Sequence, residues 1–317
     1  MSLTLKRRLK NQSKRLMRIA FEVGQRFKVD ILPRHFYSEI PDIRLLRSSS
    51  QWKAPRTMTG IRGDIDAQVA WVDQCTAPYR SALKGFEIHK SAVAANGSDE
   101  GYGEVESDFL YCFIRAHRPS RIVQIGCGVS TAAIQRAAHD EGYSPQITCI
   151  EPYPTGFLQR ESAAGHLNLV PKKVEDVGPA CVESLHSGDL FFVDSSHVLS
   201  PAGEVNLLIL EMLPCLAPGV YAHFHDIHFP YDYNPDTLTS ALFFPHETAL
   251  LYAFLVMNSR FEIAASLSML YHLRQSDLAR FFPDLSPAKF DQGLLVEGGR
   301  YPYPSSIFLR SIDAPGL

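Results

Sequence analysis

The segment Arg121–Thr131, with the sequence RIVQIGCGVST, decides the fold that we predict. It opens with an apolar, β-rich run, and Gly126 and Gly128 follow at once, before a helical pattern that starts near Ser130. A buried strand, a tight turn and a helix in this order are typical of α/β proteins, in which a ligand lies beyond the carboxyl ends of parallel strands. Because glycine has no Cβ atom, the turn can bring its backbone close to such a ligand.

The chain downstream of Val105 repeats this alternation of short β-rich runs and helical stretches. The predicted strands are residues 121–125, 146–150, 168–174, 189–193, 219–224, 261–266 and 305–310. The predicted helices are residues 130–140, 156–165, 175–186, 203–215 and 247–258. Short strands that alternate with helices indicate a mostly parallel sheet with helices on both faces. We therefore expect an α/β fold with a doubly wound, mostly parallel seven-stranded sheet.

Residues 1–100 form a predicted N-terminal extension to a domain that spans residues 101–317. The first segment, Met1–Lys28, carries nine Lys or Arg residues against one acid, and its apolar residues recur at helical spacing. This pattern predicts a basic amphipathic helix. Its apolar face could pack on its own domain or on a second subunit of a homo-oligomer, or the helix could make a peripheral contact with an anionic membrane. Residues 31–97 show no sustained period, so we expect an irregular cap there.

Composition and charge narrow the class of protein. The 317 residues carry a formal net charge of -3, which provides no general field for nucleic acid. Six scattered cysteines without a CxxC pair are typical of reduced thiols, and no apolar run is long enough to span a bilayer. We therefore expect a cytoplasmic protein without a nucleic-acid partner.

The predicted cofactor contacts begin at the glycine turn. The next strand ends at Glu151, about two dozen residues later, where a carboxylate can accept hydrogen bonds from both ribose hydroxyls. A dinucleotide fold requires a third glycine at the position of Thr131, so no pyrophosphate is implied. An adenosine ligand without phosphate fits better, and S-adenosylmethionine is the common one. Glu175 or Asp176 after the third strand could meet the adenine amino group, or both could be ordinary acids at a helix start.

Two further strand ends carry candidate catalytic residues. Asp194 and His197 follow the fourth strand, and His225 and Asp226 follow the fifth. The carboxyl ends of adjacent parallel strands meet at one edge of a sheet, so we expect these side chains to converge. Asp194 and Asp226, helped by His225, could hold Mg²⁺ or another divalent cation. His197 is the predicted general base for an acceptor hydroxyl, and His225 is the alternative.

Four segments together resemble the class I S-adenosylmethionine-dependent methyltransferases, which have a Rossmann-like fold. The segments are VQIGCGVST, GDLFFVDSSHV, EVNLLILEMLPCLAPGVYAHFHDIHFPYDY and HETALLYAFLVMNSRFEI. The chain is similar to a bacterial group with DSSH and HDIH motifs found among glycan and secondary-metabolite genes. The resemblance covers residues 36–310 and implies O-methylation of a hydroxyl on a sugar, a glycan or a secondary metabolite.

The chain is more distantly similar to macrolide-sugar O-methyltransferases, in which an Asp-x-x-His element supplies a Mg²⁺ ligand and a base. Asp194 and His197 match that element, whereas the Glu-Asp pair of these enzymes is His225-Asp226 here. The resemblance also implies that Gln124 contacts the cofactor's ammonium group and that Glu247 matches a family glutamate. Ser130, Thr131 and Asp194 are further predicted cofactor contacts. Two alternatives are a nicotinamide-dependent oxidoreductase and a non-catalytic protein that retains the fold.

Overall fold

The computed structural model describes residues 3–97, 101–233, 238, 242–285 and 304–313, and only the backbone at residues 3–11 and 13. The chain forms two compact units, Met1–Ser48 and Ser49–Leu317. The domain boundary that we predict near residue 100 stays a prediction.

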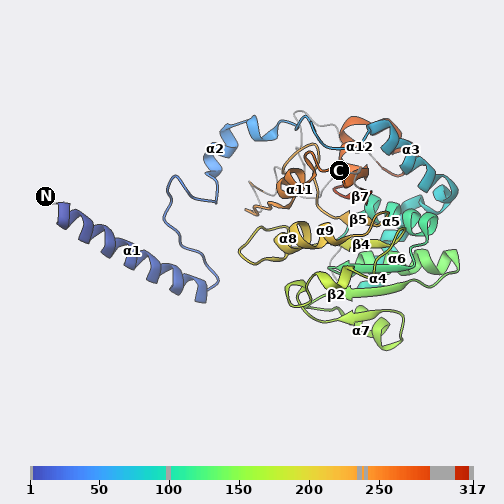
Figure 1. The fold of residues 1–317 in the computed structure, drawn as a ribbon, viewed down its shortest axis with the longest axis horizontal. Coiled ribbons are helices and arrows are strands. Elements are labelled where there is room, and N and C mark those ends of the chain that lie inside the picture. The colour runs from blue at the N-terminus through green and yellow to red at the C-terminus, as the bar shows by residue number, and fades with distance from the viewer. Residues whose placement is uncertain (1–2, 98–100, 234–237, 239–241, 286–303, 314–317) are drawn as a thin grey trace. The chain divides into compact units, whose positions relative to one another are not determined.

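The second unit is built on one seven-stranded sheet (Figure 1). Its strands are β1 (Arg121–Ile125), β2 (Gln146–Ile150), β3 (Asn168–Val170), β4 (Leu190–Val193), β5 (Tyr221–Phe224), β6 (Phe261–Ser266) and β7 (Ile307–Ser311). The order across the sheet is β3-β2-β1-β4-β5-β7-β6, and β7 pairs antiparallel with both β5 and β6 while the other pairs are parallel. The prediction of a doubly wound, mostly parallel sheet is confirmed.

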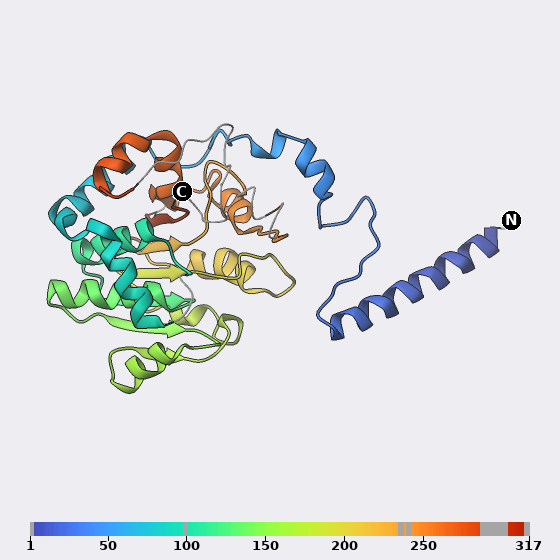
Figure 2. The ribbon, with the colours of Figure 1, turned by 180° about the vertical axis from the view of Figure 1, so that it is seen from behind.

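Helices cover both faces of this sheet because successive strand residues point to opposite sides. The first face packs against α3 (Ile65–Thr76), α4 (Glu87–Asn96), α5 (Glu104–His117), α6 (Val129–Glu141), α7 (Gly156–Ala163), α12 (Leu267–Leu273) and α13 (Gln275–Phe281). The second face packs against α8 (Glu204–Asn206), the π-helical turn η6 (Leu207–Met212), α9 (Leu213–Cys215) and α11 (Glu247–Leu255). Figure 2 shows the side that α4 and α5 cover. In β1, for example, Ile122 joins the first core and Val123 joins the second.

Two predicted elements are wrong. The helix expected at residues 175–186 is replaced by two 3₁₀ turns, η4 (Val174–Asp176) and η5 (Pro179–Val182). Gly178 between them has a φ of 75°, and Pro179 has no N–H to donate, so a continuous helix cannot form. The third strand also ends at Val170, four residues earlier than predicted.

The segment that we expect to be an irregular cap contains helices instead. α3 begins at the N-cap Asp64, whose carboxylate accepts a hydrogen bond from the N–H of Ala67 at 2.8 Å. Its buried residues include Val69, Val72 and Cys75, which recur at helical spacing. The period is short and interrupted by polar residues, so tertiary packing on the sheet, and not local pattern, stabilises this helix.

The first unit contains α1 (Leu3–Arg26) and α2 (Ile43–Ser48). The predicted N-terminal helix is therefore confirmed. Its described apolar residues Leu16, Ile19 and Val23 are exposed. None of the helices among the described residues is long and apolar enough to cross a membrane.

Candidate active site

The glycine turn after β1 lies tightly against the end of β4. Gly126 has a φ of 75°, and a Cβ atom there would lie 2.0 Å from the carbonyl oxygen of Asp194. The N–H of Asp194 in turn donates to the carbonyl of Ile125 at 2.9 Å. A side chain at position 126 would therefore displace the backbone that carries Asp194.

A cavity of about 150 Å³ opens beside this turn. It is lined by Asn96, Gly101, Tyr102, Cys127, Gly128, Val129, Ser130, Thr155 and Asp194. Three of the predicted cofactor residues, Gly128, Ser130 and Asp194, are among them. Sequence reasoning missed Asn96 on α4 and Thr155, whose hydroxyl donates to the side-chain oxygen of Asn96 at 2.8 Å.

Two other predicted cofactor residues, Glu151 and Thr131, form hydrogen bonds with the backbone of the turn. The carboxylate of Glu151 accepts hydrogen bonds from the N–H groups of Cys127 at 3.3 Å and Tyr153 at 2.9 Å. The buried hydroxyl of Thr131 accepts from the N–H of Gly128 at 3.2 Å. These bonds hold the backbone of the turn, so the contacts of Glu151 and Thr131 with a cofactor stay predictions.

Three further predicted cofactor residues, like Gly126, Thr131 and Glu151, lie outside the cavity lining. Gln124 is fully buried, and its side-chain N–H donates to the hydroxyl of Ser130 at 3.2 Å. Glu175 and Asp176 are exposed in η4. For these residues too, a cofactor contact stays a prediction.

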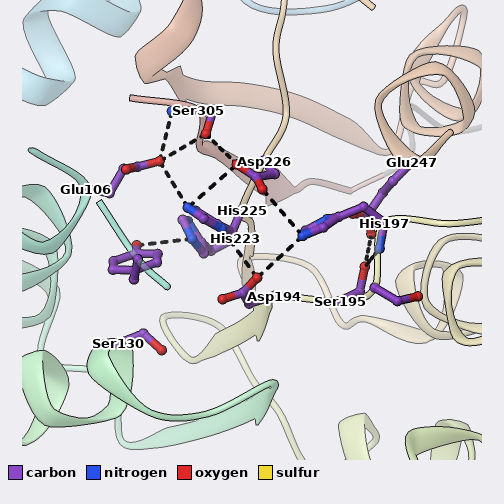
Figure 3. A network of polar contacts seen from close by, with 12 residues as sticks. Glu106, Ser130, Asp194, Ser195, His197, His223, His225, Asp226, Glu247 and Ser305 are labelled. Carbon is purple, nitrogen blue, oxygen red and sulfur yellow. Dashed lines mark hydrogen bonds and ion pairs between the residues drawn. The ribbon is translucent and has the colours of Figure 1, made fainter. Parts of the chain in front are cut away.

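The four residues that follow β4 and β5 do converge (Figure 3). Nε2 of His197 lies 3.6 Å from Oδ1 of Asp194 and 3.6 Å from Oδ2 of Asp226. Nδ1 of His225 lies 3.3 Å from the same Oδ1 of Asp194. Ligand atoms of Asp194, His197 and His225 all lie within 4.8 Å of one another, which is close enough to surround a metal ion. Asp194 also lines the cavity, so this cluster and the cavity adjoin.

A glutamate from α11 holds His197 from the opposite side. Oε2 of Glu247 lies 2.7 Å from Nδ1 of His197, and Oε1 accepts a hydrogen bond from the hydroxyl of Ser195 at 2.9 Å. Only 1% of the Glu247 residue is exposed. The imidazole therefore presents Nε2 to Asp194 and Asp226, because Nδ1 is engaged.

A second glutamate, from α5, holds His225 in a similar way. Oε1 of Glu106 lies 3.3 Å from Nε2 of His225 and also accepts a hydrogen bond from the backbone N–H of Ser305 at 2.8 Å. The hydroxyl of Ser305 donates to Oδ1 of Asp226 at 2.7 Å. Sequence reasoning missed Glu106 and Ser305. Glu106 lies in the first turn of α5 beside Glu104, where acids are common, so the sequence carries no signal that singles it out.

The carboxylates determine the charge of the two histidines. Burial opposes protonation of His197, but the hydrogen bond and charge of Glu247, with Asp226 and Asp194, outweigh it and raise the pKa to about 9. Burial also opposes protonation of His225, and the charges of Asp226, Asp194 and Glu106 raise its pKa well above the usual value. With these neighbours His197 carries a proton at neutral pH, so it must lose that proton before it can act as the base that we expect.

Two members of the cluster have unusual backbone conformations. His197 has a φ of 60° and Asp226 has a φ of 55°. The left-handed region costs a residue with a side chain about 1–2 kcal/mol. Backbone strain of this kind gathers at functional sites, where surrounding contacts maintain it.

Part of this chain matches known proteins in sequence. Residues 123–227 match a family model described as a methyltransferase domain. An uncharacterized protein of Archaeoglobus fulgidus is 29% identical over 182 residues, which cover 52% of this chain and 76% of that protein.

Two solved structures have a low similarity to this chain. The SAH-bound methyltransferase of Podospora anserina is 15% identical, with a TM-score of 0.39, over 90% of this chain and 99% of that one. The branched-chain polyamine synthase of Thermus thermophilus is 14% identical, with a TM-score of 0.41, over 75% of this chain and 70% of that one. TM-scores this low carry no argument about function. The match at residues 123–227 runs from within β1 to just beyond β5 and agrees with the methyltransferase resemblance of the sequence.

Proposed function

We propose that this protein is an S-adenosylmethionine-dependent O-methyltransferase that acts on a hydroxyl of a sugar, a glycan or a secondary metabolite. One observation carries the proposal: Asp194 belongs both to the wall of the cavity and to the histidine cluster. A methyl donor in the cavity would therefore lie next to groups that can handle the proton of an acceptor.

Methyl transfer needs an acceptor oxygen in line with the sulfonium methyl group and a place for one proton. In this proposal the turn at Gly126–Gly128 and the residues around the cavity hold the donor. The acceptor hydroxyl meets the edge formed by Asp194, His197 and Asp226, which orients it and removes its proton.

The two alternatives fit the residues less well. A nicotinamide dinucleotide needs close packing at the third glycine position, where Thr131 is fully buried and bonded to the turn. A protein that merely retained the fold would gain nothing from a strained cluster with buried, paired acids, because such groups cost stability.

Calorimetry with S-adenosylhomocysteine and NAD on the full chain tests the proposal. We expect S-adenosylhomocysteine to bind and NAD not to bind. Glu151→Ala should weaken binding by about 1–3 kcal/mol, because a charged hydrogen-bond acceptor at the turn is lost. Glu183→Ala removes an exposed acid away from the cavity lining and serves as the matched control. Binding of NAD without binding of S-adenosylhomocysteine would overturn the proposal.

The acceptor class needs a second measurement. Release of S-adenosylhomocysteine from S-adenosylmethionine should rise when sugars or glycans with free hydroxyls are added. Turnover with amine or thiol acceptors, and none with hydroxyl acceptors, would leave a methyltransferase but contradict O-methylation.

A further inference from the structure

The histidine cluster has spacings that hydrogen bonding does not explain. Nε2 of His197 is 3.6 Å from both Asp194 and Asp226, which is longer than a hydrogen bond, although all three side chains point toward one place (Figure 3). Donors at about 2.1 Å from a tetrahedral metal ion lie about 3.4 Å from one another. The separation of 3.6 Å that joins Asp194 to His197 is close to that value. The separation of 3.3 Å that joins Asp194 to His225 is also close to it, and in this structure that contact is a hydrogen bond.

We propose that Asp194, His197 and His225 bind a divalent transition-metal ion, and that Mg²⁺ is not the ion of this site. Mg²⁺ prefers oxygen ligands, whereas imidazole nitrogen suits Zn²⁺ and its first-row neighbours. Two of the three converging donors here are imidazoles. The Mg²⁺ that the resemblance to macrolide-sugar enzymes implies does not fit this donor set.

The surroundings of both histidines support this assignment. A histidine that binds a metal through one ring nitrogen usually donates its other N–H to a carboxylate, which fixes the orientation of the ring. Glu247 occupies that position for His197 at 2.7 Å, and Glu106 occupies it for His225 at 3.3 Å. Both glutamates are at most 5% exposed. Two independent helices thus place a buried carboxylate behind each proposed ligand.

The local charge is balanced either by two protonated imidazoles or by one divalent cation. Asp194, Asp226, Glu106 and Glu247 gather around the two imidazoles, and among the described residues none of the four acids pairs with Lys or Arg. Buried carboxylates are costly without a counter-charge. Binding of a metal displaces protons from imidazole ligands and supplies two positive charges in their place.

The proposed site differs in two ways from the sequence prediction. The converging set contains His197 in place of Asp226, which lies beside it and is held by Ser305. Nε2 of His197 then serves as a ligand, so His197 is not the free general base. Three protein ligands leave room for a substrate oxygen, as in catalytic metal sites.

The role of the ion rests on the proposed function. A bound divalent ion lowers the pKa of a coordinated hydroxyl. Asp226 is then the carboxylate of this chain that lies beside the ion and can orient the acceptor hydroxyl.

Metal binding can be tested without any methyl donor. The full chain is treated with a chelator and dialysed separately against Zn²⁺, Co²⁺ and Mg²⁺, and the metal bound per chain is measured by atomic emission. We expect about one Zn²⁺ or Co²⁺ per chain, with Mg²⁺ bound at least about 100-fold more weakly. The Co²⁺ form should show visible absorption with nitrogen ligands. His197→Gln and His225→Gln should each abolish this absorption.

Two further variants complete the design. Glu247→Gln should weaken metal binding by about 10–100-fold, the usual effect of a lost carboxylate behind a ligand. His139→Gln, at a side chain that is 86% exposed on α6, should leave binding unchanged and serves as the matched control. Circular dichroism and urea denaturation show that each variant is folded.

The outcomes separate this inference from the proposed function. Tight binding of Mg²⁺, no metal bound to the folded wild-type chain, or undiminished binding in both histidine variants would overturn the metal site. If metal binds as expected but S-adenosylhomocysteine does not, the metal site stands and the proposed methyltransferase activity is refuted.

Discussion

Gly126→Ala provides a quantitative test of how the glycine turn is packed. The new residue would have to keep a φ of 75°, which costs about 1–2 kcal/mol when a side chain is present. Its Cβ would also lie 2.0 Å from the carbonyl oxygen of Asp194, so the backbone at the end of β4 must move by about 1 Å or more. Overpacking of this kind costs about 1–3 kcal/mol. The sum is a loss of about 2–5 kcal/mol in the free energy of unfolding.

Gly142→Ala is the matched control, because it isolates the conformational cost from the clash. Gly142 ends α6 with a φ of 69°, and an added Cβ would meet nothing within 4 Å. Urea denaturation should therefore show a loss of only about 1–2 kcal/mol for this variant. Gly126→Ala should also weaken binding of S-adenosylhomocysteine, since Asp194 lines the cavity. Equal losses of stability in the two variants would refute the argument that the turn lies against β4.

Two further predictions concern other parts of the chain. Burial, with the nearby charges of Asp284 and Glu104, raises the pKa of Asp108 from 3.8 to about 8, so the folded protein keeps a proton that the unfolded chain releases. The free energy of unfolding should therefore fall by about 1.4 kcal/mol per pH unit between those pKa values, and Asp108→Asn should flatten this slope in urea titrations; an unchanged slope would contradict the assignment. For α1, we propose a peripheral contact with anionic lipid, worth about 1 kcal/mol for each basic residue near the surface. The full chain should sediment with anionic vesicles at low salt, and a chain without residues 1–28 should not; a dimer that is lost in the shorter chain would assign the helix to a subunit contact instead.

Most strands of the sheet could be predicted because each is a short apolar run with a clear boundary. β1, β2 and β6 have the predicted bounds, and β4 and β5 begin one and two residues later than predicted. Most residues of these strands are buried and apolar, so the strands stand out from the polar loops between them. The order of the strands then follows from right-handed crossovers, which leave few topologies to choose from.

Helices without a strong local signal were predicted less well. α3 and α4 lie in a stretch whose period is weak, and they form because they pack on the sheet and on α6. After β3, by contrast, the sequence predicts a helix that does not form. Residues 175–186 include helix-forming residues, but they also include Gly178 and Pro179. Pro179 decides the local structure against the helix-forming residues around it, because it has no N–H to donate to a helical hydrogen bond.

In the candidate site too, the residues at the strand ends could be predicted from the topology, whereas the residues that pack against them from helices could not. Asp194, His197, His225 and Asp226 were predicted together because adjacent parallel strands must end at one edge. Glu106 and Glu247 belong to helices on opposite faces of the sheet, and the contact of Glu106 with Ser305 joins residues 199 positions apart. No spacing in the sequence encodes such a contact. Yet these two glutamates select which ring nitrogen each histidine presents. The resemblance indicated Glu247 without giving it a role, and nothing in the sequence indicated Glu106, so the chemistry of the cluster depends on contacts that only the folded chain reveals.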